Sequence, residues 1–105
     1  MGLTFKEDVP DLRNTRVTDV VAELADYGMA VDVHDPFADP AEAARDLGLT
    51  LIDPVAGAYD GIILAVRHRP FLDMGAAAIR ALGRPGHVFF DLKSAFGPAD
   101  SDLRL

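Results

Sequence analysis

Basic side chains recur where the apolar, strand-like segments of this 105-residue chain end. Five of its ten lysines and arginines occupy such positions: Lys6, Arg13, Arg67, Arg69 and Lys93. Cations that converge near the N-terminus of a helix favour phosphate groups, because both supply positive charge to the ligand. The pattern therefore predicts an anion-binding site, with recognition of phosphate as the chemistry that suits it.

An alternative for the first of these loops stays open. Lys6 and Arg13 stand among the acidic residues Glu7, Asp8 and Asp11, and they could pair with these carboxylates to form only a solvated loop. Composition alone does not decide between a solvated loop and a phosphate-binding one.

Two further polar residues at strand ends are weaker candidates. Asp91 could serve as a general base, yet an aspartate in this position commonly caps the following turn. His34 precedes Asp35, and we expect a hydrogen-bonded histidine there rather than a metal ligand. No second ligand lies at a recognisable zinc spacing from His34.

Alternating strand-like and helix-like segments must position these residues. The strand-like segments are 1–5, 30–34, 49–52, 61–66 and 87–90. The helix-like segments run from an N-cap at Asn14 or Thr15 to Gly28, from an N-cap at Asp39 to Gly48, and from Phe71 to Leu82. This order predicts an open, mostly parallel Rossmann-like α/β sheet of about five strands, with helices on both faces. Ligands bind beyond the C-terminal ends of the strands in such sheets, which is where the basic residues fall.

Composition narrows the function further. The chain is long enough for one domain, and it has no cysteine to act as a nucleophile or metal ligand. A net charge of −7 argues against nucleic acid but allows a small anion in a cleft where a few cations gather. No apolar run is long enough to span a membrane and the N-terminus is no signal peptide, so we expect a cytoplasmic location. No Gly-x-Gly-x-x-Gly follows the first strand-like segment, so a self-contained dinucleotide-binding domain is not expected.

The first segment carries a specific resemblance. Gly-Leu-Thr-Phe-Lys-Glu at 2–7, followed by Pro-Asp-Leu-Arg-Asn at 10–14, resembles the start of the C-terminal domain of the UDP-glucose/GDP-mannose dehydrogenase family. The similarity is closest to the branch that acts on UDP-N-acetylhexosamines. It continues in order through Val31–Pro36, Tyr59–Val66 with His68 and Phe71, and Phe89–Lys93.

The resemblance implies that residues 1–105 are the UDP-sugar-binding domain of a longer NAD-dependent UDP-sugar 6-dehydrogenase. Such enzymes oxidise the C6 alcohol to a uronic acid for surface polysaccharide biosynthesis, through a cysteine that lies in a preceding region. Phe5 and Lys6 would contact the UDP-sugar, and Lys93 would add a second contact to the same substrate. Arg13 would reach NAD, which is bound mainly by an N-terminal domain. Full-length members are expected to form homo-oligomers.

Two consequences follow for this chain. The resemblance implies no catalytic residue and no metal ligand within it, so the isolated chain is expected to be inactive as a dehydrogenase. In the family the first strand begins several residues before Gly2, so we expect a truncated central strand here. The alternatives are a free-standing, non-catalytic nucleotide-binding module and an oligomerisation domain.

Overall fold

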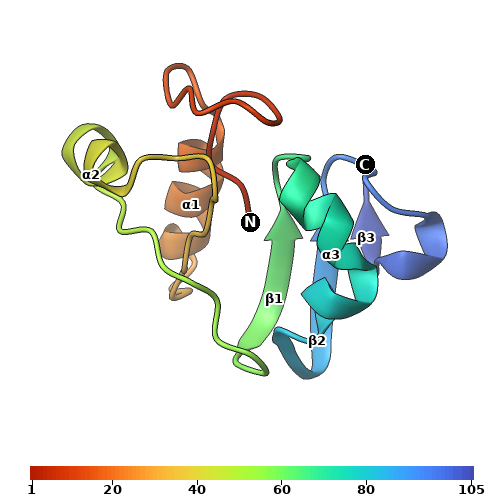
Figure 1. Ribbon diagram of the computed structural model, residues 1–105. Helices are drawn as coiled ribbons and strands as arrows, with labels where there is room; N and C mark the ends of the chain where they lie inside the picture. The colour runs from red at the N-terminus through yellow and green to blue at the C-terminus, as the bar shows by residue number, and fades with distance from the viewer.

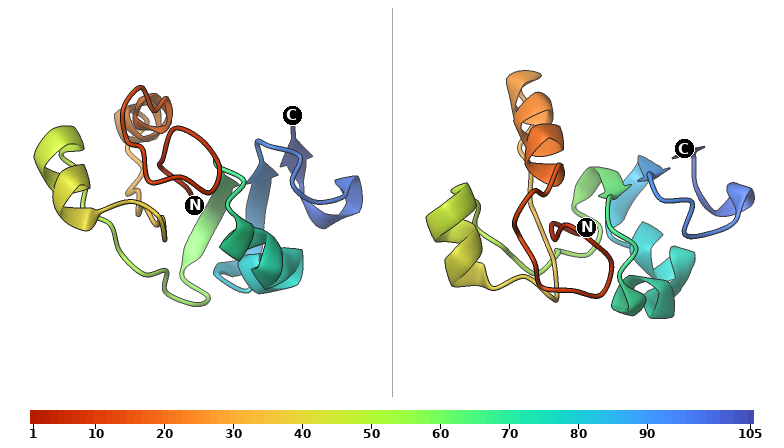
Figure 2. Two further views of the ribbon diagram at one scale, coloured as in Figure 1. Left: turned by 45° about the horizontal axis from the view of Figure 1, so that its top comes forward. Right: turned by 90° about the horizontal axis from the view of Figure 1, so that it is seen from above.

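A parallel sheet with helices on both sides forms the centre of the computed structural model, which describes residues 1–105 (Figure 1). The helical elements are α1 (Val17–Asp26), α2 (Pro40–Glu42) with a π-helical continuation (Ala43–Leu47), α3 (Arg69–Arg80) and a 3-10 turn (Pro98–Asp100). The strands are β1 (Tyr59–Leu64), β2 (Gly83–Asp91) and β3 (Leu103–Arg104), in the order β1-β2-β3 and all parallel. Figure 2 shows α1 and α3 on opposite sides of the sheet. The predicted open, parallel α/β fold is confirmed.

The sheet has three strands rather than about five. The strand pairing between segments 30–34 and 49–52 is limited to an isolated parallel bridge between Val33 and Leu51. The polar tail, by contrast, contains β3, which pairs with Phe90 and Asp91 of β2. A strand becomes regular only where a partner offers a continuous row of backbone groups, and segment 30–34 lacks such a row on the side that faces β1.

The first segment supplies only the end of a strand at that position. The Met1 ammonium donates to the Ile63 carbonyl at 2.8 Å, and the Ala65 N–H donates to the Met1 carbonyl at 2.9 Å. On the other side, the Gly2 N–H donates to the His34 carbonyl at 2.8 Å. Met1 and Gly2 thus connect β1 to segment 30–34 through only a few backbone hydrogen bonds. This agrees with the expected truncation of the first strand.

Only glycine fits at position 2. Its φ is +95°, and a Cβ there would lie 2.6 Å from the Val66 Cβ. Both the left-handed backbone and the close approach to the end of β1 exclude a side chain.

A trough of about 720 Å³ lies between α1 and β1, and Met1 and Gly2 contribute to its lining. The apolar face of α1 lines it with Val17, Val20, Val21 and Leu24, and no residue of α1 is buried. The apolar core is accordingly divided into two clusters. One contains Leu3, Leu12, Val33, Ala38 and Ala43, and the other contains Ile62, Leu64, Phe71, Ile79 and Phe89.

The helix boundaries follow the turn residues with small differences. Asp39 caps α2 by accepting from the Ala41 N–H at 2.9 Å, as predicted. Gly28 and Gly48 adopt φ values of +81° and +67° where their helices end. The N-cap prediction for α1 is wrong by one residue, because Arg16 occupies that position without a side-chain bond.

Thr15 is displaced from the cap by a longer-range contact. Its hydroxyl donates to the Leu3 carbonyl at 2.6 Å and accepts only weakly from the Val17 N–H at 3.3 Å. α3 begins earlier than predicted and is interrupted at Gly75, whose φ of 81° and ψ of 159° are not helical. None of the helices has the length and apolarity needed to cross a lipid bilayer.

The buried N-terminus should make stability depend on pH between about 6 and 8. Burial lowers the pKa of the Met1 amino group from 8.0 to about 6. Between these values the unfolded chain binds a proton that the folded chain excludes, so the free energy of unfolding rises with pH across this window. A shift of this size corresponds to roughly 2–3 kcal/mol.

Urea denaturation at several pH values, on the chain and on an N-acetylated form, would measure this contribution. The two forms differ only at the amino group, so the difference between their pH profiles isolates the contribution of Met1. Parallel profiles for the two forms would contradict the prediction.

Candidate functional site

Four loops or strand ends meet at the C-terminal edge of the sheet. They are the loop 4–8 after the first segment, residues 67–69 after β1, residues 92–94 after β2, and the end of β3 (Figure 1). All strands of a parallel sheet end on the same side, so residues that follow different strands are brought to one edge. The predicted gathering of basic residues there is confirmed for Lys6, Arg67, Arg69 and Lys93.

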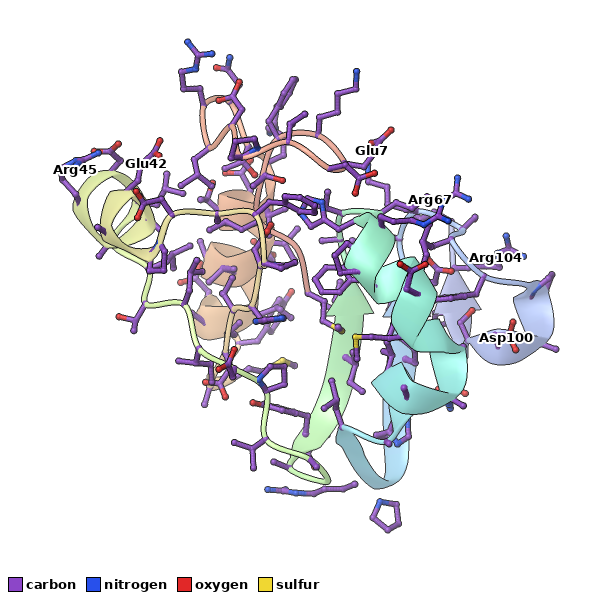
Figure 3. The ribbon with its side chains drawn as sticks, viewed as in Figure 1. Glu7, Glu42, Arg45, Arg67, Asp100 and Arg104 are labelled. Atoms are coloured by element: carbon purple, nitrogen blue, oxygen red, sulfur yellow. The ribbon has the colours of Figure 1, made fainter.

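Four of the basic side chains at this edge form no ion pair, although Arg69 pairs with Asp73. Six of the ten basic side chains form ion pairs with aspartates: Arg13, Arg16, Arg45, Arg69, Arg80 and Arg84. The four that form none are Lys6, Arg67, Lys93 and Arg104, and all four belong to the C-terminal edge. Figure 3 shows Arg67 and Arg104 extending from it. In a chain of net charge −7, unpaired positive charge is thus concentrated in one place, which suits a small anion.

Lys6 and Arg13, the two basic residues near the first loop, differ in whether they form an ion pair. Arg13 donates through Nε and its terminal nitrogen to the two oxygens of Asp11, at 3.1 and 3.2 Å. These bonds lower the pKa of the Asp11 carboxyl and raise that of the guanidinium. The solvated ion-pair alternative therefore holds for Arg13, whose side chain is 85% exposed, but not for Lys6.

Phe5 and Lys6 lie next to each other at the surface of this loop. Phe5 is 56% exposed although it is a large apolar side chain, and Lys6 is exposed beside it. Their backbone is fixed, because the Phe5 N–H donates to the Asp11 carbonyl at 2.7 Å and the Thr4 hydroxyl donates to the Lys6 carbonyl at 3.1 Å. An exposed aromatic ring beside a cation offers a stacking surface together with a charge for phosphate.

Lys93 is presented by a turn that Asp91 holds. Asp91 is fully buried and accepts from the backbone N–H groups of Lys93, Ala95 and Phe96 at 3.2, 3.0 and 3.0 Å. A carboxylate enclosed in this way stabilises the turn, whereas a general base must reach the substrate. The structure favours the turn-capping interpretation of Asp91.

His34 is hydrogen-bonded at the end of its segment, as expected. Its Nδ1 donates to the Ile52 carbonyl at 3.1 Å. This bond joins segment 30–34 to segment 49–52, beside the bridge between Val33 and Leu51.

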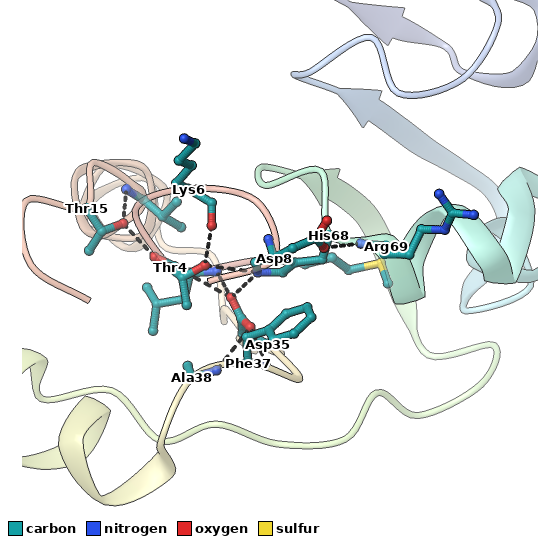
Figure 4. Close-up of polar contacts among 12 residues, drawn as sticks. Thr4, Lys6, Asp8, Thr15, Asp35, Phe37, Ala38, His68 and Arg69 are labelled. Atoms are coloured by element: carbon teal, nitrogen blue, oxygen red, sulfur yellow. Dashed lines mark hydrogen bonds and ion pairs between the residues drawn. The ribbon is translucent and has the colours of Figure 1, made fainter. Parts of the chain in front are cut away.

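Asp35 has a role that sequence reasoning missed. Its carboxylate is buried beneath the first loop and accepts five hydrogen bonds (Figure 4). The donors are the N–H groups of Leu3, Thr4, Phe37 and Ala38 and the Nε2 of His68, at 2.6, 2.9, 2.7, 3.2 and 2.8 Å. Burial alone would raise the pKa of Asp35, but the bonds from His68 and the backbone hold it well below its usual range. Asp35 therefore stays ionised and anchors the start of the loop.

Arg104 was also missed, because it follows none of the strand-like segments that the sequence predicts. Leu103 and Leu105 flank it at the two-residue spacing of a strand, a signal too short to be distinctive. In the structure its Nε donates to the Ser94 hydroxyl at 3.3 Å, next to Lys93.

Comparison with known proteins identifies the family of the chain. Residues 1–98 match the sequence profile described as "UDP-glucose/GDP-mannose dehydrogenase family, UDP binding domain". The whole chain is 55% and 45% identical to the UDP-N-acetyl-D-glucosamine 6-dehydrogenases of Pseudomonas aeruginosa and Salmonella typhi, and it covers 25% of each. Over 89% of its length it is 40% identical to Protein CapL of Staphylococcus aureus, of which it covers 22%. The chain thus spans about a quarter of the length of these relatives. It belongs to the UDP-glucose/GDP-mannose dehydrogenase family and corresponds to the UDP binding domain of that family.

Proposed function

We propose that this chain is the C-terminal, UDP-sugar-binding domain of a longer NAD-dependent UDP-N-acetylhexosamine 6-dehydrogenase. The observation that carries the proposal is the set of four unpaired cations at the C-terminal edge of an otherwise acidic chain. A diphosphate is the part of a UDP-sugar that such a set would recognise. The names of the relatives from Pseudomonas aeruginosa and Salmonella typhi support the choice of sugar.

Each residue has a role in this proposal. Phe5 offers its exposed ring to the nucleotide or sugar, while Lys6 and Lys93 supply charge for the diphosphate. Lysine is a mobile point charge and suits a flexible diphosphate, whereas the planar guanidinium of Arg13 suits a fixed contact to a phosphate or ribose. Arg13 would then exchange Asp11 for NAD when the two parts of the enzyme close together.

The chemistry itself would take place outside this chain. NAD, held mainly by the rest of the enzyme and contacted by Arg13 of this chain, would supply the hydride acceptor for the two oxidations that convert the C6 alcohol, with one water molecule, to the uronic acid. The chain offers NAD one exposed guanidinium, Arg13, and it contains no cysteine for a covalent intermediate. Its own residues bind and orient the substrate, in a protein used in the cytoplasm for polysaccharide biosynthesis.

NMR titration of the chain with UDP would test the site. We expect chemical-shift changes centred on Phe5, Lys6 and Lys93, with small changes for uridine, which lacks the phosphates. Lys6→Ala should weaken UDP binding, whereas Arg16→Ala removes an exposed cation that pairs with Asp19 and should leave it unchanged. Shift changes near Gly28 or Gly83 instead would place the ligand at the opposite edge and refute the proposed site.

The division of roles between Lys6 and Arg13 makes a kinetic prediction for the longer enzyme. Arg13→Ala should raise the KM for NAD more than that for the UDP-sugar, and Lys6→Ala should do the reverse. Loss of a charge-assisted hydrogen bond costs roughly 1.5–3 kcal/mol, or about 10- to 150-fold. Steady-state kinetics with each substrate varied in turn would measure both effects, and equal defects for both substrates would contradict the assignment.

A further inference from the structure

The ring of His68 has a defined tautomer. Its Nδ1 faces the backbone N–H of Asp8 at 2.9 Å, and an N–H group can only donate. Nδ1 must therefore be unprotonated, which places the proton on Nε2. From there it is shared between the Asp35 carboxylate at 2.8 Å and the Thr4 hydroxyl oxygen at 3.1 Å (Figure 4). His68 is fully buried, between the rings of Phe37 and Phe71 at 4.7 and 5.6 Å.

The same ring contacts both ends of the loop that carries Phe5 and Lys6. At one end, Nε2 reaches Thr4, whose hydroxyl in turn donates to the Lys6 carbonyl at 3.1 Å. At the other end, Nδ1 receives the Asp8 N–H, and the Asp8 carboxylate accepts from the Arg69 N–H at 2.5 Å.

Asp8 also has a backbone conformation that needs support. Its φ is +61°, in the left-handed region that non-glycine residues occupy only when their surroundings hold them there. The hydrogen bonds that join Asp8 to His68 and to Arg69 stabilise this conformation.

We propose that His68 is a positioning residue that fixes Phe5 and Lys6 in their nucleotide-binding arrangement through its neutral, Nε2-protonated ring. It does not touch the ligand. This inference rests on the proposed function, and it assigns the preorganisation of that site to one side chain. A loop that is already ordered loses less conformational entropy when the ligand binds, so releasing the Asp8 end should weaken UDP binding roughly tenfold.

Two amide substitutions separate the two contacts of the ring. The amide nitrogen of glutamine can take the place of Nε2, so His68→Gln keeps the donor to Asp35 and loses the acceptor for Asp8. The amide oxygen of asparagine can take the place of Nδ1, so His68→Asn keeps the acceptor for Asp8 and loses the donor to Asp35. His87→Gln is the control, since His87 bonds to the Arg84 carbonyl at 2.7 Å, away from the loop.

We expect His68→Gln to remain folded, to exchange the amide hydrogens of Glu7 and Asp8 faster than wild type, and to bind UDP about tenfold more weakly. We expect His68→Asn to be the less stable variant while its folded form binds UDP nearly as wild type does. His87→Gln should change neither quantity. Wild-type amide exchange and UDP affinity in His68→Gln, or affinity losses that simply follow lost stability in both variants, would overturn the proposal.

Two measurements on the ligand-free wild-type chain test the positioning role of His68 independently of the proposed function. Nitrogen-15 NMR of the imidazole should show the proton on Nε2, and a proton on Nδ1 would overturn the proposal without any substitution. Slow amide exchange at Asp8 should be present before any nucleotide is added. If the wild-type chain shows both properties yet does not bind UDP, the proposed function fails while the positioning role of His68 stands.

Discussion

Replacing Asp35 by alanine is expected to lower the free energy of unfolding by about 3–5 kcal/mol, a large part of the stability of a domain of this size. The carboxylate accepts five hydrogen bonds, and its removal would leave those donors without partners inside the protein. The same substitution would detach the start of the first loop from segment 30–34. Thermal or urea denaturation would measure the loss.

Asp53→Ala is the matched control. Asp53 is fully exposed and lies 3.8 Å from His34, so its replacement should change stability by no more than about 0.5 kcal/mol. A similar small effect for Asp35→Ala would show that the buried carboxylate does not anchor the loop.

Acid should remove the stabilisation that the Asp35 carboxylate provides. The folded-state pKa of Asp35 lies well below its ordinary value of 3.8, so below pH 4 the unfolded chain binds a proton that the folded chain does not. The stabilisation from Asp35 is therefore complete above about pH 4 and is lost as the pH falls further. The difference in stability between wild type and Asp35→Ala should shrink in acid, and a constant difference would contradict this account.

The chain on its own is expected to bind UDP about a thousandfold more weakly than the longer enzyme does, in the millimolar range. Lys6 and Lys93 are both exposed, and neither lines the trough beside α1, so these cations lie on an open surface. Binding sites normally enclose most of a small ligand, and an open edge leaves the phosphates in water, where charge interactions are weak. Contacts worth ~4 kcal/mol from the remainder of the enzyme account for a factor of a thousand.

Isothermal titration of both proteins, at low and at physiological ionic strength, would measure this difference. Exposed charges are screened by salt, so binding to the isolated chain should weaken strongly as salt is added. Micromolar affinity of the chain, or affinity that salt does not change, would mean that the edge is a complete site by itself. Arg84→Ala removes an exposed cation that pairs with Asp60 and serves as the control.

The sequence was sufficient for the fold class and for the edge of the sheet at which the basic residues gather. Helix limits depend on local features, such as Pro40 after Asp39 and the glycines at 28 and 48, and these are visible without a structure. The position of the basic residues after apolar segments placed them at one edge, because parallel strands end on the same side. The motif around Phe5 and Lys6 indicated the family, to which the whole-chain similarity also points.

Only the tertiary structure decided which charged side chains can face a ligand and which form ion pairs or hydrogen bonds within the chain. Lys6 and Arg13 have similar acidic neighbours in the sequence, yet only Arg13 forms an ion pair. Asp35 and His68 are far apart in the chain and meet because two segments end side by side. β3 and the division of the core depend on whether a backbone partner is present, which local periodicity does not report. Ion pairs, buried hydrogen bonds and strand pairs are set by distances in space, and the sequence order of their members carries little information about those distances.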